Sequence, residues 1–259
     1  MSVWSKKMTP EMGSAWVTGA SSGIGRAVAL RLASEGWVVW ASARREDKLA
    51  ELASEHPNIR PLAADVTDAE AMARAVATIT AEAPLALAIL NAGAYHPMRA
   101  QTFSAETARQ TFDVNVNGMI NSLEPVLAHM IARRDGHIAI TASVAGYRGL
   151  PRAAAYSATK AALIAMAEAL AFDLIDLNVR MTVINPGFVK SEATAQNNHR
   201  MPFLLETDDA ARRIVEGLKQ PRFEIAFPRR FAFLLRAIGA LPNQWYFGVM
   251  RKLMGWPPS

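Results

Sequence analysis

The residues of this chain whose types and spacing suggest chemistry are Tyr156 and Lys160, with Ser143 thirteen residues upstream of the tyrosine. A separation of four residues is about one helical turn, so on a helix the phenol and the ammonium share one face. A phenol has an ordinary pKa of about 10 and transfers protons poorly at neutral pH. A fixed positive charge beside it would lower that pKa, so the pair predicts general acid–base catalysis. The structural alternative is a half-buried tyrosine next to a solvated lysine.

A glycine-rich turn lies near the N-terminus. Residues 18–25 carry glycines in the pattern Gly-x-x-x-Gly-x-Gly, between an apolar strand at 15–17 and a helical pattern at 26–35. Glycines let the backbone turn tightly and approach a pyrophosphate, while the free N–H groups of a helix N-terminus attract anions. We therefore expect a phosphate cradle, and a merely flexible turn is the alternative.

With these residues in view, the chain resembles the short-chain dehydrogenase/reductase family over residues 13–228. Five features carry the resemblance in order: the turn 18–25, Asn91-Ala92-Gly93, Asn115, the set of Ser143, Tyr156 and Lys160, and Pro186-Gly187. The resemblance implies a nicotinamide cofactor and a catalytic tetrad of Asn115, Ser143, Tyr156 and Lys160. It implies no metal.

The resemblance also implies which residues contact the cofactor. Asp65 and Val66, after the third strand, match the pair beside the adenine ring, and the Pro186-Gly187 turn passes the nicotinamide. The full predicted set is Gly19, Ser21, Ser22, Gly23, Ile24, Arg44, Asp65, Val66, Asn91, Ala92, Gly93, Tyr156, Lys160, Pro186, Gly187 and Val189.

The end of the second strand bears on the choice of cofactor. An acidic residue there would accept hydrogen bonds from a ribose 2′-hydroxyl and repel a 2′-phosphate. Residues 41–45 read Ala-Ser-Ala-Arg-Arg, without a carboxylate, and Arg44 can bind a 2′-phosphate with help from Ser21 or Ser22. We expect NADP(H), with NAD(H) as the weaker alternative. Both arginines could instead simply begin a solvated helix.

The resemblance implies a division of roles among the tetrad. In the reductive direction a hydride passes from the nicotinamide to a carbonyl carbon, Tyr156 donates a proton to the oxygen, and Ser143 hydrogen-bonds that oxygen. Lys160 lowers the phenol pKa and binds the nicotinamide ribose. Asn115 disturbs its helix so that a backbone carbonyl holds a water linking Lys160 to solvent. The predicted function is interconversion of a ketone or aldehyde and an alcohol.

The substrate side is expected to be largely apolar. Residues 188–205 should form a variable substrate lid that mixes apolar and polar side chains, and these residues could equally serve only to pack the lid. The side chains expected there are Phe188, Met201, Phe203, Leu204 and Leu205, with the polar Gln196, Asn197, Asn198 and His199, and Tyr147, Leu150 and Met98 around the same opening. His96 could line the mouth or be an ordinary loop histidine.

Alternating elements position these residues. Apolar runs predict strands at 15–17, 38–42, 59–64, 85–90, 138–141, 181–184 and 223–227. Helical patterns lie at 24–35, 46–55, 68–82, 104–132, 157–176 and 207–219, with Ser104 and Thr207 as expected N-caps. Strands that alternate with helices predict an α/β fold: a Rossmann-type doubly wound sheet of about seven parallel strands, with helices on both faces.

Composition sets limits. The 259 residues are 51% hydrophobic, which predicts one domain at 1–228. There is no cysteine, and the five histidines lack ligand spacing. We see no signal peptide and no run of about eighteen apolar residues that could span a membrane. The expected location is the cytoplasm, with peripheral contact at the inner membrane surface left open.

The C-terminal extension, residues 229–259, is basic and apolar. Residues 225–259 contain Arg229, Arg230, Arg236, Arg251 and Lys252 and no acidic residue, while the rest of the chain is neutral, so the formal net charge of +5 lies wholly in this segment. Such a helical extension could cover the core or a partner subunit in a homodimer, or lie on an anionic membrane surface. No nucleic-acid recognition motif accompanies the charge.

Two rival functions remain open. A 3-oxoacyl-carrier-protein-type reductase would share the catalytic residues, and Arg133-Arg134 could contact an acidic carrier. A non-catalytic nicotinamide sensor would use the same fold, although an intact tetrad argues against it. The partner expected in either enzymatic case is a small-molecule carbonyl or alcohol, free or carrier-bound.

Overall fold

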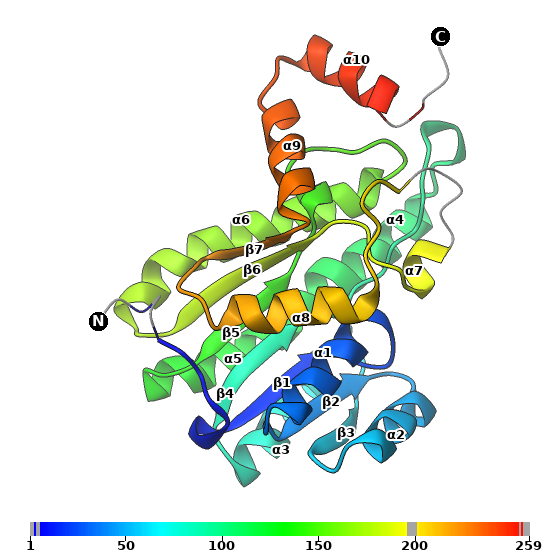
Figure 1. Cartoon of the computed structure of the whole chain (residues 1–259). Helices are drawn as coiled ribbons and strands as arrows, with labels where there is room; N and C mark the ends of the chain where they lie inside the picture. The colour runs from blue at the N-terminus through cyan, green and yellow to red at the C-terminus, as the bar shows by residue number, and fades with distance from the viewer. Residues whose placement is uncertain (1–2, 4–5, 196–200, 254, 256–259) are drawn as a thin grey trace.

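A seven-stranded sheet forms the centre of the molecule (Figure 1). The structure is a computed structural model that describes residues 3, 6–195, 201–253 and 255. All strand pairs are parallel, in the order β3-β2-β1-β4-β5-β6-β7. The strands are β1 (Ser14–Thr18), β2 (Val39–Ala43), β3 (Ile59–Ala63), β4 (Leu85–Leu90), β5 (His137–Thr141), β6 (Arg180–Pro186) and β7 (Glu224–Phe227). The predicted doubly wound α/β sheet is confirmed.

Helices cover both faces of this sheet, which is why the central strands read as continuous apolar runs. Every residue of β1 and β4 is buried. One face packs against α1 (Gly23–Ser34), α2 (Glu46–Glu55) and α8 (Thr207–Leu218) through side chains such as Leu32, Leu49 and Ile214. The other face packs against α3 (Ala69–Glu82), α5 (Gly118–Arg133) and α6 (Ala154–Asp176) through Ile79, Val126 and Leu163.

The helix predicted at 104–132 is two helices joined by a wider turn. The helix α4 (Ala105–Phe112) passes into a π-helical turn, η4 (Asp113–Asn117), before α5 begins. Ser104 caps α4 as predicted, because its side chain accepts a hydrogen bond from the Thr107 N–H. The prediction that Thr207 caps α8 is wrong: Thr207 is the first helical residue, and Glu206 is the N-cap without a side-chain hydrogen bond.

Two helices of the C-terminal extension stand beside the end of the sheet at which β6 and β7 finish (Figure 1). They are α9 (Arg229–Gly239) and α10 (Asn243–Leu253), which follow β7 directly. The buried face of α9 packs with Val144 and the two buried residues of α10 in a small separate core. Among the described residues, no helix is both long and apolar enough to cross a membrane.

The topology decides where a ligand can bind. Strand order reverses between β1 and β4, since the chain moves outward from β1 to β3 and then returns to the other side of β1. At such a point the loops after the strands diverge and leave a crevice at the carboxyl ends. The short elements beyond these ends are η3 (Ala100–Thr102), η5 (Val144–Gly146) and α7 (Glu192–Ala195), while η2 (Pro10–Met12) precedes β1.

Candidate active site

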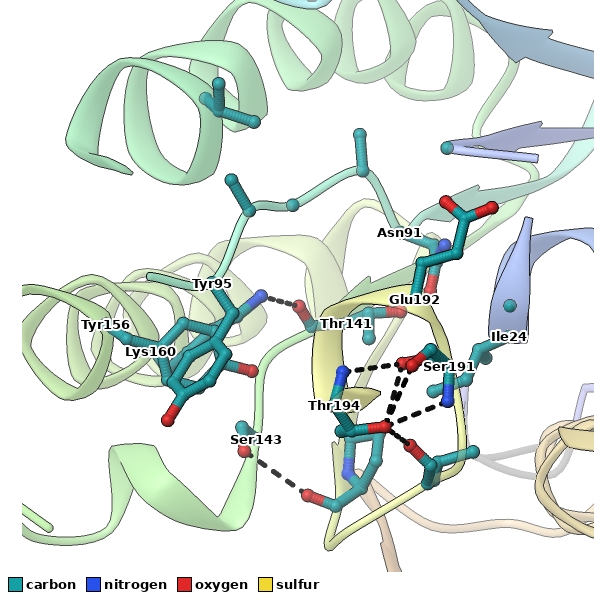
Figure 2. Close-up of a pocket in the computed structure, with 18 of the residues that line it drawn as sticks. Ile24, Asn91, Tyr95, Thr141, Ser143, Tyr156, Lys160, Ser191, Glu192 and Thr194 are labelled. Carbon is teal, nitrogen blue, oxygen red and sulfur yellow. Dashed lines mark hydrogen bonds between the residues drawn. The ribbon is translucent and has the colours of Figure 1, made fainter. Parts of the chain in front are cut away.

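A cleft of about 570 Å³ opens at the carboxyl ends of the strands. It is lined by the loops that follow β1 to β6, so segments far apart in sequence meet there. All of the predicted cofactor residues line this one cleft: Gly19, Ser21, Ser22, Gly23, Ile24, Arg44, Asp65, Val66, Asn91, Ala92, Gly93, Tyr156, Lys160, Pro186, Gly187 and Val189. Ser143 lines it too, and Figure 2 shows its hydroxyl on the same side as the Tyr156 ring.

The glycine-rich loop is built so tightly that side chains are excluded. Gly19 has φ +67°, and a Cβ there would lie 2.8 Å from the Ala92 Cα. A Cβ on Gly25 would lie 2.3 Å from the Gly19 carbonyl oxygen. Because Ser22 at the N-cap of α1 makes no side-chain capping bond, the first N–H groups of the helix face the cleft without a side-chain acceptor. This geometry fits a phosphate-bearing ligand.

Thr18 locks the turn after β4 against this loop. Its hydroxyl accepts hydrogen bonds from the Asn91 N–H at 2.9 Å and from the Ala92 N–H at 3.1 Å. The Asn91 side-chain amide donates in return to the Thr18 carbonyl at 3.2 Å. The two turns that flank the reversal of strand order are therefore held as one unit.

Tyr156 and Lys160 lie one turn apart on α6, on the face turned toward the cleft (Figure 2). The Lys160 side chain is buried, and its Nζ donates to the Thr141 carbonyl at 2.9 Å and lies 5.6 Å from the centre of the Tyr156 ring. The Tyr156 ring packs edge-on against Tyr95 with 4.9 Å between ring centroids. The predicted helical pairing of phenol and ammonium is present.

Burial moves the pKa values of both groups. Burial raises the pKa of Tyr156 to about 12, against an opposing hydrogen bond with Ser143 that lowers it, and Tyr95 adds to the rise. Burial lowers the pKa of Lys160 to about 8. The expected lowering of the phenol pKa is therefore contradicted, because withdrawal of the phenolate from water outweighs the opposing hydrogen bond with Ser143.

Ser143 joins two strand ends beside the phenol. Its side chain is buried, donates to the Pro186 carbonyl at 3.3 Å and accepts from the Ala145 N–H at 3.1 Å. The serine therefore holds the loop after β5 to the turn after β6. Its hydroxyl is fixed where a polar atom of a ligand beside Tyr156 would meet it.

Asn115 is fully buried and is not among the cleft-lining residues that the structure describes. Its amide donates to the Ala94 carbonyl and to the Thr159 hydroxyl, both at 3.0 Å, and its oxygen accepts from the Ala94 N–H at 2.6 Å. It lies in the π-helical turn, where the resemblance predicts a disturbed helix. In this geometry Asn115 is a positioning residue that fastens the loop after β4 to α6.

Arg44 and Arg45 both line the end of the cleft next to β2, and both are exposed. Arg45 donates to the Ser21 hydroxyl at 3.1 Å and pairs with Glu192 of α7 at 3.2 Å. From the sequence it was expected only as a residue that could begin a solvated helix. Sequence reasoning missed this residue as a site residue. The signal that could have identified it is the pair of consecutive arginines at positions 44 and 45.

The apolar end of the cleft corrects several expectations. Leu150 and Phe188 line it, but Tyr147 and Met98 do not: the Tyr147 hydroxyl donates to Glu224 at 2.5 Å, and Met98 is buried beside Ala153. The His96 Nδ1 is 3.2 Å from the Thr111 hydroxyl, and His96 is not among the described residues that line the cleft.

Two aromatic residues at this end escaped the sequence reading. Tyr95 follows the Asn-Ala-Gly turn, and Phe231 comes from α9, so the C-terminal extension contributes to the wall. Phe231 lies 5.8 Å from Phe188 and 5.8 Å from Phe203, measured between ring centroids. No periodicity in the sequence links α9 to the cleft, because the contact depends on where the chain leaves β7.

The predicted lid is only partly described. Val189 lines the cleft, whereas Met201, Phe203, Leu204 and Leu205 are not among its lining residues in the described part of the chain. Gln196, Asn197, Asn198 and His199 lie outside the described residues. Within the described residues, no three His, Cys, Asp or Glu side chains gather closely enough to hold a metal ion.

A glycine-rich turn at a helix N-terminus and a buried tyrosine–lysine pair in one cleft of a doubly wound sheet are typical of oxidoreductases with a Rossmann fold. The model of the short chain dehydrogenase family matches residues 14–202. An uncharacterized oxidoreductase of Myxococcus xanthus is 42% identical over 244 residues, covering 92% of this chain and 96% of the relative. The chain belongs to the short-chain dehydrogenase family, as the resemblance implies.

Solved structures agree on the fold. A short chain dehydrogenase from Burkholderia cenocepacia, in complex with NADP, has a TM-score of 0.82 at 24% identity and covers 96% of this chain and 100% of its own. A short chain dehydrogenase/reductase from Burkholderia phymatum, in complex with NAD, has a TM-score of 0.80 at 24% identity and covers 88% of this chain and 94% of its own.

The buried ammonium generates a stability prediction. The folded-state pKa of Lys160, about 8, is below the ordinary 10.5, so between these pH values the unfolded chain holds a proton that the folded chain lacks. The loss of folding free energy that comes from burying the Lys160 ammonium is thus fully present below pH 8 and disappears as the pH rises to 10.5. We expect Lys160→Met to stabilise the protein at pH 7 by at most about 3 kcal/mol, from 1.36 kcal/mol per pKa unit.

Urea unfolding of wild type and Lys160→Met at several pH values measures this effect. The stability difference between the two should shrink toward high pH. The matched control is Lys7→Met, at an exposed lysine, whose effect should not vary over that interval. A Lys160→Met difference that stays constant with pH would contradict a buried charge at this position.

Proposed function

We propose that this protein is an NADP(H)-dependent oxidoreductase that interconverts a ketone or aldehyde and an alcohol on a largely apolar small molecule. The observation that carries the proposal is the meeting of Tyr156, Ser143 and Lys160 at one end of a cleft whose other end is a glycine-built anion cradle. The solved relatives named in complex with NADP and with NAD support a nicotinamide cofactor.

The residues of the cleft divide naturally along a dinucleotide. The Gly19 to Gly25 loop and the start of α1 would take the pyrophosphate, and Asp65 with Val66 would lie beside the adenine. Lys160, whose Nζ has one described acceptor, has donors left for ribose hydroxyls. A bound nicotinamide would supply or accept the hydride at the Tyr156 end of the cleft.

In the reductive direction Tyr156 would act as the proton donor. At neutral pH a phenol with a pKa of about 12 keeps its proton, so it can donate to a carbonyl oxygen as negative charge develops there. Ser143, buried and fixed by two hydrogen bonds, would hydrogen-bond the same oxygen and hold it in line. In the opposite direction the Tyr156 oxygen would accept the proton that leaves the alcohol.

The adenosine end favours a 2′-phosphate. Arg44 and Arg45 bring two guanidinium groups to the end of β2, and Arg45 already donates to the Ser21 hydroxyl. Charge-assisted hydrogen bonds from arginine to phosphate oxygens are strong and geometrically specific. A free 2′-hydroxyl would find no carboxylate acceptor in β2 or directly after it before Glu46.

The lining of the reactive end favours an apolar substrate. Beyond Tyr156, Ser143 and Lys160 the wall consists of uncharged side chains, chiefly Tyr95, Val144, Leu150, Pro151, Phe188 and Phe231. Such a surface gains from covering apolar groups and offers no described cation for a carboxylate or phosphate. Arg133 and Arg134 lie at the end of α5, before the start of β5. They are therefore at the amino ends of the strands, opposite the cleft, and the carrier-protein alternative loses support.

We also propose a homodimer through the outer faces of α5 and α6. An apolar groove between these helices is lined by Ile120, Leu123, Glu124, Leu127, Met166, Ala169 and Leu170. Further along, Phe172 is 76% exposed and Ile175 is 42% exposed. A second copy related by a two-fold axis would cover this surface with the same surface.

The acid–base role is tested by Tyr156→Phe in an assay of NADPH oxidation against ketones, quinones, steroids and acyl thioesters. We expect kcat to fall by at least 10²- to 10⁴-fold because no proton donor remains. NADPH binding, measured by fluorescence, should persist. The control is Tyr246→Phe in the C-terminal extension, which removes a phenol hydroxyl that donates to the Gly149 carbonyl. Full activity in Tyr156→Phe refutes the role, and tight NADPH binding without turnover on any substrate favours the sensor.

Cofactor preference is tested by Arg44→Gln combined with Arg45→Gln. The KM for NADPH should rise roughly 10- to 100-fold, the equivalent of one or two charge-assisted hydrogen bonds, while the KM for NADH changes little. Arg60→Gln, at an exposed arginine on β3, is the control. Equal losses with NADPH and NADH would show that the two arginines do not read the 2′-phosphate.

The dimer is tested by Phe172→Glu with light scattering after size-exclusion chromatography. A carboxylate buried at the two-fold interface has no partner, so the variant should have half the mass of the wild type. Phe103→Glu, at another exposed phenylalanine, should leave the mass unchanged. A monomeric wild type, or equal masses for wild type and Phe172→Glu, would contradict this interface.

A further inference from the structure

The α9–α10 arm, residues 229–253, is held firmly although it projects from the domain (Figure 1). Arg148, which follows η5, donates to the Gly239 carbonyl at 2.5 Å and the Leu241 carbonyl at 2.7 Å, and its guanidinium stacks 4.0 Å from the Tyr246 ring centre. The Tyr246 hydroxyl donates in turn to the Gly149 carbonyl at 2.6 Å. The arm is therefore a built structure with a fixed outward surface.

That outward surface is rich in large apolar side chains. Phe233 is 75% exposed, Trp245 65% and Phe247 61%, and Leu234, Val249 and Leu253 are partly exposed beside them. In α10 only Tyr246 and Met250 are buried. Aromatic side chains so exposed on two consecutive helices leave apolar area in contact with water at a cost.

Basic side chains interleave with these aromatic residues. Phe233 follows Arg229 by four residues and Arg230 by three, so all three share the exposed face of α9. Arg251 and Lys252 lie in the last turn of α10. Residues 225–259 contain no acidic side chain, and although Arg236 pairs with Glu224 of β7, the arm keeps an excess of positive charge.

The charge distinguishes between the two kinds of partner that could cover this patch. In a symmetric contact between two copies, the same surface meets itself, so the basic residues of both arms would approach one another. An anionic lipid surface instead attracts each basic residue while its interfacial region accepts aromatic and aliphatic side chains. Since no described helix could span a bilayer, the contact would be peripheral.

We propose that the α9–α10 arm docks the protein on the surface of an anionic lipid bilayer. Phe233, Trp245 and Phe247 enter the interfacial region, and Arg229, Arg230 and Lys252 lie among the headgroups. The opposite side of α9 carries Phe231, which lines the cleft, so a single helix joins the docking surface to the apolar end of the site. The arm is in this view an attachment to a catalytic domain at 1–228.

The full-length protein is tested by co-sedimentation with phosphatidylcholine vesicles prepared with and without phosphatidylglycerol. We expect binding to the vesicles that contain phosphatidylglycerol and release by high salt, since exposed charges are screened. Arg229→Gln with Arg230→Gln should weaken the binding roughly thirtyfold, from the usual contribution of a basic residue near an anionic surface. The matched control is Arg60→Gln with Arg74→Gln, which removes the same charge from exposed positions on β3 and α3.

A second variant separates the apolar contribution from the charge. Phe233→Ser with Trp245→Ser should lose vesicle binding while the melting temperature stays near that of the wild type, because both side chains are exposed. Absence of binding to phosphatidylglycerol vesicles, or an equal loss in the Arg60/Arg74 control, overturns the proposal. So does a lower solution mass of the Phe233/Trp245 variant, which would make a second copy of the chain the occupant of the arm surface.

Discussion

The burial of the Lys160 ammonium is the constraint on which the rest of this site depends. A cation removed from water must find acceptors, and the described structure gives its Nζ one carbonyl, that of Thr141 at the end of β5. The folded chain therefore carries a charge that it solvates poorly, facing the cleft beside Tyr156. Ligand hydroxyls placed there would complete its hydrogen bonds, so part of the affinity for a ligand comes from relieving a cost built into folding.

The surrounding elements keep that charge where it is. The β4 loop cannot move away from α6, because Asn115 bonds to both Ala94 and Thr159. The same loop is tied to the glycine turn through Thr18 and Asn91. The glycine turn and the part of α6 that carries Tyr156 and Lys160 are thus joined by one network of hydrogen bonds.

How far sequence reasoning reached depends on whether a feature is local. The spacing of Tyr156 and Lys160 and the glycine pattern after β1 are properties of one turn of helix and one loop, so the sequence predicted them with their geometry. The direction of the Tyr156 pKa shift depends on how deeply several elements bury the phenol, and no local pattern records that depth. The contributions of Tyr95 and Phe231 escaped for the same reason, since each reaches the cleft only through the path of its loop or helix.

A compact cluster connects the C-terminal arm to the catalytic end of the cleft. Glu224 of β7 accepts hydrogen bonds from the Tyr147 hydroxyl and the Asn185 amide at 2.5 and 2.6 Å, and it pairs with Arg236 of α9 at 2.6 Å. The Arg236 guanidinium also stacks on the Tyr147 ring, 4.6 Å from its centre. Tyr147 lies four residues after Ser143, so the carboxylate ties the arm to the loop that fixes the serine. These contacts fasten the arm to the loop beside Tyr156, which makes the arm and the site parts of one structure.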